Sequence, residues 1–188
     1  MVEQNREPKL ARSTTLKTAI AIGLDECMTA LDESLQNMSN EQAWSYPFPD
    51  RHNVTTLVMH CQQNLDEHAC FFQGGQWALT HEDRFNVWAR SIEQVRAQMN
   101  GDLPTVAEMR QRLSTLRAAV MHVLEGSSEQ DLLSPRPGIE WFTRFHRTAA
   151  DAYMRTVMHT MAHVRQIWYL RGAMGISDKD GFPHQHWA

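Results

Sequence analysis

Residues 157–172 read VMHTMAHVRQIWYLRG, and this stretch decides the fold class. Apolar residues recur in it every three or four positions, which is the spacing of one side of an amphipathic helix. Extending the pattern predicts a helix from about Thr148 to Arg171, about 35 Å long at 1.5 Å per residue. Its apolar side consists of Tyr153, Val157, Met161, Val164 and Trp168. A single helix cannot bury such a side alone, so this one has to pack against partners.

Upstream, two further segments show the same spacing. The first begins at Thr14, and its apolar positions continue to Met38. For the second, Asn53 is a suitable N-cap, and we expect a helix to about Phe72 that the glycines at 74–75 end. The apolar positions expected in its core are Val54, Val58, Cys61, Leu65 and Phe72.

A third segment carries apolar residues from Val106 to Leu124. Pro104 can open this helix at its first position, and Gly126 suits the position just past its end. A less regular pattern predicts one more helix at 85–99.

Four long amphipathic helices, each with one apolar side, predict an all-α protein built as a four-helix bundle. The long connections permit crossovers, so an up-down-up-down order is not required. We expect a short extra helix or hairpin within the connections, for instance at 127–147. The predicted organisation is a flexible N-terminus at 1–13, a single bundle domain at 14–175 and an irregular tail at 176–188.

Composition narrows the function classes. The 188 residues are 42% hydrophobic and 21% charged with a net charge of −4, and we find no basic stripe, so no nucleic-acid partner is expected. No apolar stretch is long enough for a membrane span, and the N-terminus lacks an apolar signal region, so we expect a cytoplasmic protein. The three cysteines form no C-x-x-C pair, which indicates reduced thiols buried in helices.

Two histidines of the last helix, His159 and His163, are four residues apart and therefore face the same way. Their nitrogens can meet at one point, where zinc or nickel accepts imidazole at about 2.0–2.1 Å. The alternative is a pair of half-buried histidines bonded to carbonyls or water. The motif H-T-M-A-H has no Glu after its first His, which excludes a thermolysin-like protease.

A third ligand has to come from another helix, and His60 is the best candidate because it lies mid-helix beside the apolar side. The alternative is an ordinary interior histidine. His68 is a weaker candidate nearer the end of the same helix. The other histidines lie in loops, on less suitable faces or, as a loose H-x-H pair, in the tail: His52, His81, His122, His146, His184 and His186.

Three polar residues could support these ligands from outside. Asn64 and Glu67 share the side of His60, and Gln166 follows His163 by three residues. The alternative for each is a solvated residue on the helix surface.

Two stretches carry a resemblance to a known family. SNEQAWSYPFPDRHNVTTLVMHCQQNLDEHACFFQGG at 39–75 resembles the DinB-like superfamily (DinB/YfiT-type metal-binding bundles) in its helix end, its proline loop and its mid-helix His followed by a Glu seven residues on. HTMAHVRQIWYLRG at 159–172 resembles the C-terminal H-x-x-x-H-x-x-Q-I-x-x-L-R pattern of the same superfamily. With order and spacing, the resemblance covers the chain from about residue 14 to 175.

The resemblance implies a DinB-type bundle with crossover connections, often dimeric, and a triad of His60, His159 and His163 around one divalent metal. The superfamily includes a maleylpyruvate isomerase that uses mycothiol, S-transferases that use bacillithiol or related thiols, and many members without an assigned activity. The leading hypothesis is therefore a metal-dependent transferase that acts with a low-molecular-weight thiol on a small molecule, as a homodimer. The alternatives are a metal-dependent hydrolase with metal-bound water as nucleophile, and a non-catalytic metal-binding or stress-response dimer.

Overall fold

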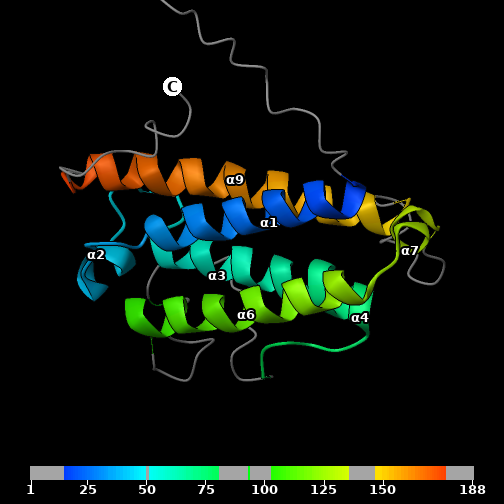
Figure 1. The fold of residues 1–188 in the computed structure, drawn as a ribbon. Helices are drawn as coiled ribbons and strands as arrows, with labels where there is room; N and C mark the ends of the chain where they lie inside the picture. Colours follow the sequence, from blue (N-terminus) through cyan, green and yellow to red (C-terminus); the bar gives the residue numbers. More distant parts are fainter. Residues whose placement is uncertain (1–14, 50, 81–92, 94–102, 136–146, 177–188) are drawn as a thin grey trace, which may run out of the picture.

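The computed structural model describes residues 15–49, 51–80, 93, 103–135 and 147–176. Four long helical segments lie side by side in it (Figure 1): α1 (Leu16–Glu33), α3 (Val54–Asn64) with its continuation as the π-helix η1 (Leu65–Phe71), α6 (Val106–Gly126) and α9 (Ala149–Ala173). Three short helices accompany them: α2 (Asn40–Trp44), α4 (Phe72–Gly74) and α7 (Glu129–Leu133). The described residues form no strand, only one isolated bridge between Pro135 and Thr148. The predicted all-α bundle is confirmed.

Contacts between helix ends give the directions of the helices. Lys17, at the start of α1, donates from Nζ to the carbonyls of Glu125 and Ser127 at the end of α6, so α1 and α6 are antiparallel. Arg171, near the end of α9, donates to the carbonyls of Ser34 and Gln36 just past the end of α1, so α1 and α9 are parallel.

The remaining pair, α3 and α6, also runs parallel. Gly74, at the end of α4, packs against Val123 near the end of α6, and Gln62 of α3 donates to the carbonyl of Met109 near the start of α6. The second segment therefore ends at one end of the bundle and α6 begins at the other (Figure 1), so the two are joined by a crossover connection, as the sequence permitted.

Polar N-caps set the starts of the four long segments, and one prediction was wrong here. Asn53 caps α3 as expected, and Thr148 caps α9. Pro104, by contrast, is not the first residue of α6. Thr105 is the N-cap and forms a capping box with Glu108, because its hydroxyl can accept a backbone N–H that a proline side chain cannot.

The helix ends differ from the predictions in three places. The first helix stops at Glu33 and not near Met38, because Ser34 caps its end and the chain then turns through Asn37 at φ 56°; Met38 is buried all the same. Gly126 is the last residue of α6, with Ser127 as its C-cap. Phe72 is only half-buried, because the π-helix shifts the register of the buried side.

The end of the second segment was predicted correctly. It stops at Gly74, and Gly75 follows at φ 76°. The helix predicted at 85–99, apart from Glu93, lies outside the described residues, as do residues 1–13 and the tail from 177. No described helix combines the length and the apolar character that a membrane span requires.

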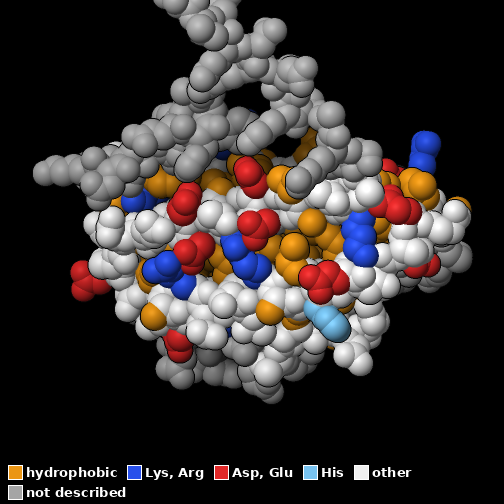
Figure 2. All heavy atoms as spheres, viewed as in Figure 1, with side chains coloured by type: hydrophobic (Ala, Val, Ile, Leu, Met, Phe, Trp, Pro, Cys, Tyr) orange, Lys and Arg blue, Asp and Glu red, His pale blue; other side chains and the backbone are white. Residues whose placement is uncertain are grey.

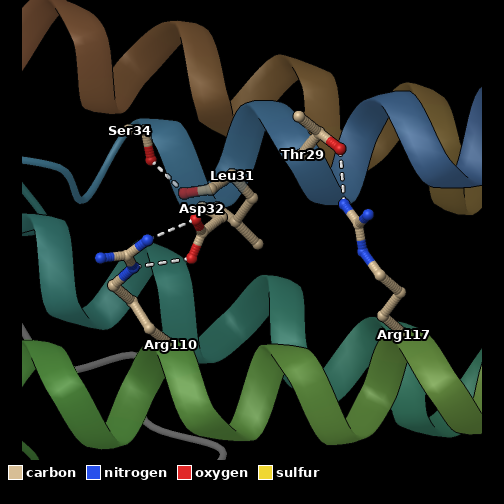
Figure 3. Close-up of polar contacts among 6 residues, drawn as sticks. All are labelled: Thr29, Leu31, Asp32, Ser34, Arg110 and Arg117. Atoms are coloured by element: carbon tan, nitrogen blue, oxygen red, sulfur yellow. Dashed lines mark hydrogen bonds and ion pairs between the residues drawn. The ribbon is translucent and has the colours of Figure 1, made fainter.

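Charged side chains link α1 to α6 on the surface (Figure 3). Arg110 makes two hydrogen bonds of 2.8 and 2.7 Å to the Asp32 carboxylate, and Arg117 bonds Thr29 and pairs with Asp25. Figure 2 shows acidic and basic side chains on this face of the molecule with apolar side chains between them. Exposed pairs of this kind contribute little stability, so the apolar core has to hold the helices together.

Candidate metal centre

Three imidazoles from two helices meet at one point between α3 and α9. The Nε2 atom of His159 lies 2.9 Å from Nε2 of His60 and 3.2 Å from Nε2 of His163. The ligand atoms of all three rings lie within 4.8 Å of one another. Three nitrogens bound tetrahedrally at 2.0–2.1 Å would be separated by about 3.3 Å, so the cluster fits a divalent cation with little movement. The predicted approach of His60 to the other two histidines is confirmed.

The local sequence explains this convergence. His159 and His163 are one turn apart on α9, and their neighbours on the same side, Ala152, Thr156 and Leu170, are all buried. This side of α9 therefore faces the bundle interior. His60 lies on α3, which packs against α9.

All three imidazoles are half-buried, so the cluster is in contact with both the interior and the solvent. Three neutral imidazoles can occupy three positions around a cation and leave at least one position for another ligand. Partial exposure is consistent with such an open position.

The surroundings keep the three imidazoles neutral. Burial, followed by the neighbouring imidazoles of His159 and His163, lowers the pKa of His60 to about 3. Burial, His163 and Arg155 lower the pKa of His159 to about 4. Burial also lowers the pKa of His163, although its hydrogen bond to Gln166 acts in the opposite direction. Protons therefore compete little with a metal ion for these nitrogens near neutral pH.

One of the three expected outer partners contacts a triad imidazole. Oε1 of Gln166 lies 2.8 Å from Nδ1 of His163 and can accept its proton in a hydrogen bond. Because Nδ1 then carries the proton, Nε2 presents its lone pair to the centre of the cluster. In the described part of the chain, no hydrogen bond joins Asn64 or Glu67 to the three rings.

The carboxylates near the end of α3 are not arranged as ligands. Asp66 is buried and accepts hydrogen bonds from the backbone N–H groups of Ala78 and Leu79. Burial, followed by the neighbouring Asp66, raises the pKa of Glu67. Asp66 therefore fixes the chain that follows α4.

His52 is a residue whose position the sequence did not predict. It lies close enough to lower the pKa values of both His60 and His163. The loop that carries it runs along the second half of α9, where Phe48 stacks on Tyr169 with ring centroids 5.5 Å apart. One feature of the sequence could have indicated that His52 lies near the cluster. It directly precedes the N-cap Asn53, at the start of the helix that carries His60.

Two further histidines in the described part of the chain, His68 and His122, do not join the cluster. His68 is buried and packs edge-on against Phe72, and His122 is exposed on α6. Four more lie outside the described residues: His81, His146, His184 and His186.

The cysteines offer no nucleophile. All three are buried and free, as predicted. Burial raises the pKa of Cys27 and of Cys70 to about 12 and raises that of Cys61 as well. Since the thiolate is the reactive form, these thiols are inert near neutral pH.

Comparison with known proteins informs the fold alone. No family model matches this sequence, and no curated protein matches it. The crystal structure of a conserved protein from Enterococcus faecalis is similar, with a TM-score of 0.64 and 18% identity over 85% of this chain and 96% of that chain. The two chains share a fold.

Proposed function

We propose that this chain is a DinB-like metal-binding protein in which His60, His159 and His163 hold one divalent cation, zinc or nickel. The observation that carries the proposal is the convergence of three Nε2 atoms, with separations of 2.9 and 3.2 Å along the cluster. The two sequence motifs that resemble the DinB-like superfamily supply these same three histidines. Imidazole donors suit zinc and nickel better than calcium or magnesium, which prefer oxygen.

We further propose that the protein transfers a group to a low-molecular-weight thiol. When bound, the cation would lower the pKa of a thiol and favour its thiolate form. The thiolate sulfur then forms a bond to an electrophilic carbon of the small-molecule substrate, the bond from that carbon to its leaving group breaks, and the leaving group departs with the electron pair. The thiol proton passes to solvent. The three buried cysteines support an external thiol, because no protein thiol is available.

Metal analysis of purified protein tests the first part. We expect one equivalent of zinc or nickel in the wild type, and loss of stoichiometric metal in His60→Ala, His159→Ala and His163→Ala. His122→Ala is the matched control, since His122 is exposed on α6. Unchanged occupancy in any triad variant removes that residue from the site.

The activity test follows consumption of small thiols mixed with an activated aryl halide. A transferase consumes both reactants only when metal is present, and the triad variants are inactive. A metal-dependent hydrolase cleaves its substrate without any thiol. A non-catalytic metal-binding protein shows neither turnover, and its thermal stability falls when a chelator removes the metal.

A further inference from the structure

The Nδ1 atom of His159 has no hydrogen-bond partner in the described part of the chain, although it is buried. Its Nε2 is turned toward His60 and His163, so Nδ1 points away from the centre of the cluster. If Nε2 holds a cation, the ring proton must reside on Nδ1, which becomes an obligatory donor. A buried donor without an acceptor destabilises the state that contains it.

A complementary atom lies on the facing helix. Oδ1 of Asn64 is a buried acceptor that also has no hydrogen-bond partner among the described residues. Asn64 lies four residues after His60 and therefore on the same side of α3, one turn or about 6 Å further along.

The helix directions place Asn64 and His159 at about the same level along the bundle. The loop before α3 contacts the end of α9, where Phe48 stacks on Tyr169 and Ser45 donates to Met174, so α3 and α9 are antiparallel. One turn forward from His60 on α3 therefore corresponds to one turn back on α9. Helical side chains lean toward the N-terminus, so the His159 ring covers that same turn.

Two hydroxyl groups of α9 are alternative acceptors for this proton, and one of them already makes a hydrogen bond. The Thr156 hydroxyl donates to the Ala152 carbonyl. The Thr160 hydroxyl is buried without a hydrogen-bond partner among the described residues, and it lies about 100° around α9 from His159. We propose that Asn64 is a positioning residue whose Oδ1 accepts the Nδ1–H of His159 when the triad holds its cation. Asn64 would then orient the His159 ring by accepting its Nδ1 proton, as Gln166 orients the His163 ring. This inference rests on the proposed function, because the donor exists only when metal is bound.

Zinc affinity, measured by competition with a chromogenic chelator, tests the pairing. Loss of an outer partner typically weakens metal binding about 10- to 100-fold, so we expect that loss in Asn64→Leu. Asn64→Asp keeps an acceptor and should bind zinc at least as tightly as the wild type. Gln63→Leu is the matched control, because Gln63 Oε1 is also buried and unpartnered but lies on an adjacent side of α3.

A spectroscopic test needs no variant at position 64. In ¹⁵N-labelled zinc-loaded protein, the Nδ1–H proton of His159 should give a slowly exchanging resonance that disappears in His159→Gln. The resonance should shift in Asn64→Asp and exchange rapidly in Asn64→Leu. A rapidly exchanging proton in the wild type contradicts the pairing.

The outcomes separate the two proposals. If the wild type binds zinc and Asn64→Leu binds it equally well, only the role of Asn64 is overturned. Equal weakening by Gln63→Leu also overturns it, since the effect is then one of packing. If the wild type binds neither zinc nor nickel, the metal centre and the role of Asn64 are both overturned.

Discussion

At the scale of single residues, the cluster depends on how each imidazole is oriented. His163 has a visible partner in Gln166, at 2.8 Å, and this partner is an amide. An amide oxygen accepts the Nδ1 proton without adding a negative charge. The cation would therefore keep more of its charge than it would beside a carboxylate partner, and its ability to acidify a ligand would be greater.

Substitution of Gln166 should change metal affinity in opposite directions. Gln166→Ala removes the acceptor and should weaken zinc binding about 10-fold or more, whereas Gln166→Glu makes the His163 ring more basic and should strengthen it. Chelator competition measures both affinities. Gln111→Ala, an exposed glutamine on α6, should behave as the wild type. If both Gln166 variants bind zinc as the wild type does, the hydrogen bond does not orient the ligand.

Acid should destabilise the metal-free protein through the same three residues. The pKa values of His60 and His159 are lowered from 6.5 to about 3 and about 4, mainly by burial, and that of His163 is lowered too. Between about pH 4 and 6.5 the unfolded chain therefore binds more protons than the folded one, so the free energy of unfolding falls as the pH falls through this window.

Urea denaturation of chelator-treated protein at about pH 7 and about pH 5 measures this dependence. A variant with all three histidines replaced by Gln should lose much less stability between the two pH values. An equal loss in wild type and triple variant would assign the acid sensitivity to other groups.

Part of the site could be predicted at this scale and part could not. Helical spacing brought His159 and His163 together, and the same rule placed Gln166 one turn after His163. His60 was chosen as the third ligand for its place mid-helix beside the apolar side, and the resemblance carried by two motifs strengthened that choice, because no local spacing rule relates residues on different helices. His52 was missed because its position depends on the path of a loop, which residue periodicity does not encode.

At the scale of helices, N-caps explain most of the correct boundaries. The Thr148 hydroxyl accepts from the Asp151 backbone N–H, and the Asp151 carboxylate accepts from the Thr148 N–H in return. The end of α3 was less predictable. No residue type in the sequence marks the point where α3 changes to the π-helix η1. The prediction that Phe72 is buried in the core was therefore wrong.

Removal of the α9 cap should lower stability without affecting metal binding. Thr148→Ala removes an acceptor of a helix N–H group, and we expect a loss of about 1 kcal/mol in the free energy of unfolding. Thr148→Ser keeps the hydroxyl and should retain most of the stability. Urea denaturation measures both, while zinc affinity should stay at the wild-type value, since the ligands lie three turns away. A fall in zinc affinity would show that the start of α9 positions the histidines.

At the scale of the whole molecule, apolar periodicity was sufficient for the fold class, because each long helix has one side that must be buried. It could not specify which helices are parallel. That order depends on contacts between distant residues, such as the buried Arg171 guanidinium, which bonds the Ser34 and Gln36 carbonyls and stacks on Trp168. A sequence does not distinguish a buried arginine that donates to backbone carbonyls from an arginine on the surface.

Three exposed apolar side chains support the proposed homodimer. Ile22 is 54% exposed on α1, and Met154 and Met158 are 43% and 70% exposed on α9. The two helices are parallel neighbours, and Gly23 packs against Val157, so Ile22 and Met158 lie at the same level. Exposed apolar residues that gather on one face are typical of an interface, and we propose that a second copy of the chain covers them.

Light scattering at several concentrations tests this assembly. We expect a wild-type mass of twice 21.7 kDa and, because a charge would be buried without a partner, a mass of 21.7 kDa for Met158→Glu. Leu133→Glu is the matched control, since Leu133 is 56% exposed on α7, and it should remain dimeric. A wild type of 21.7 kDa at all concentrations would contradict the homodimer. A dimeric Met158→Glu would place the interface elsewhere on the bundle.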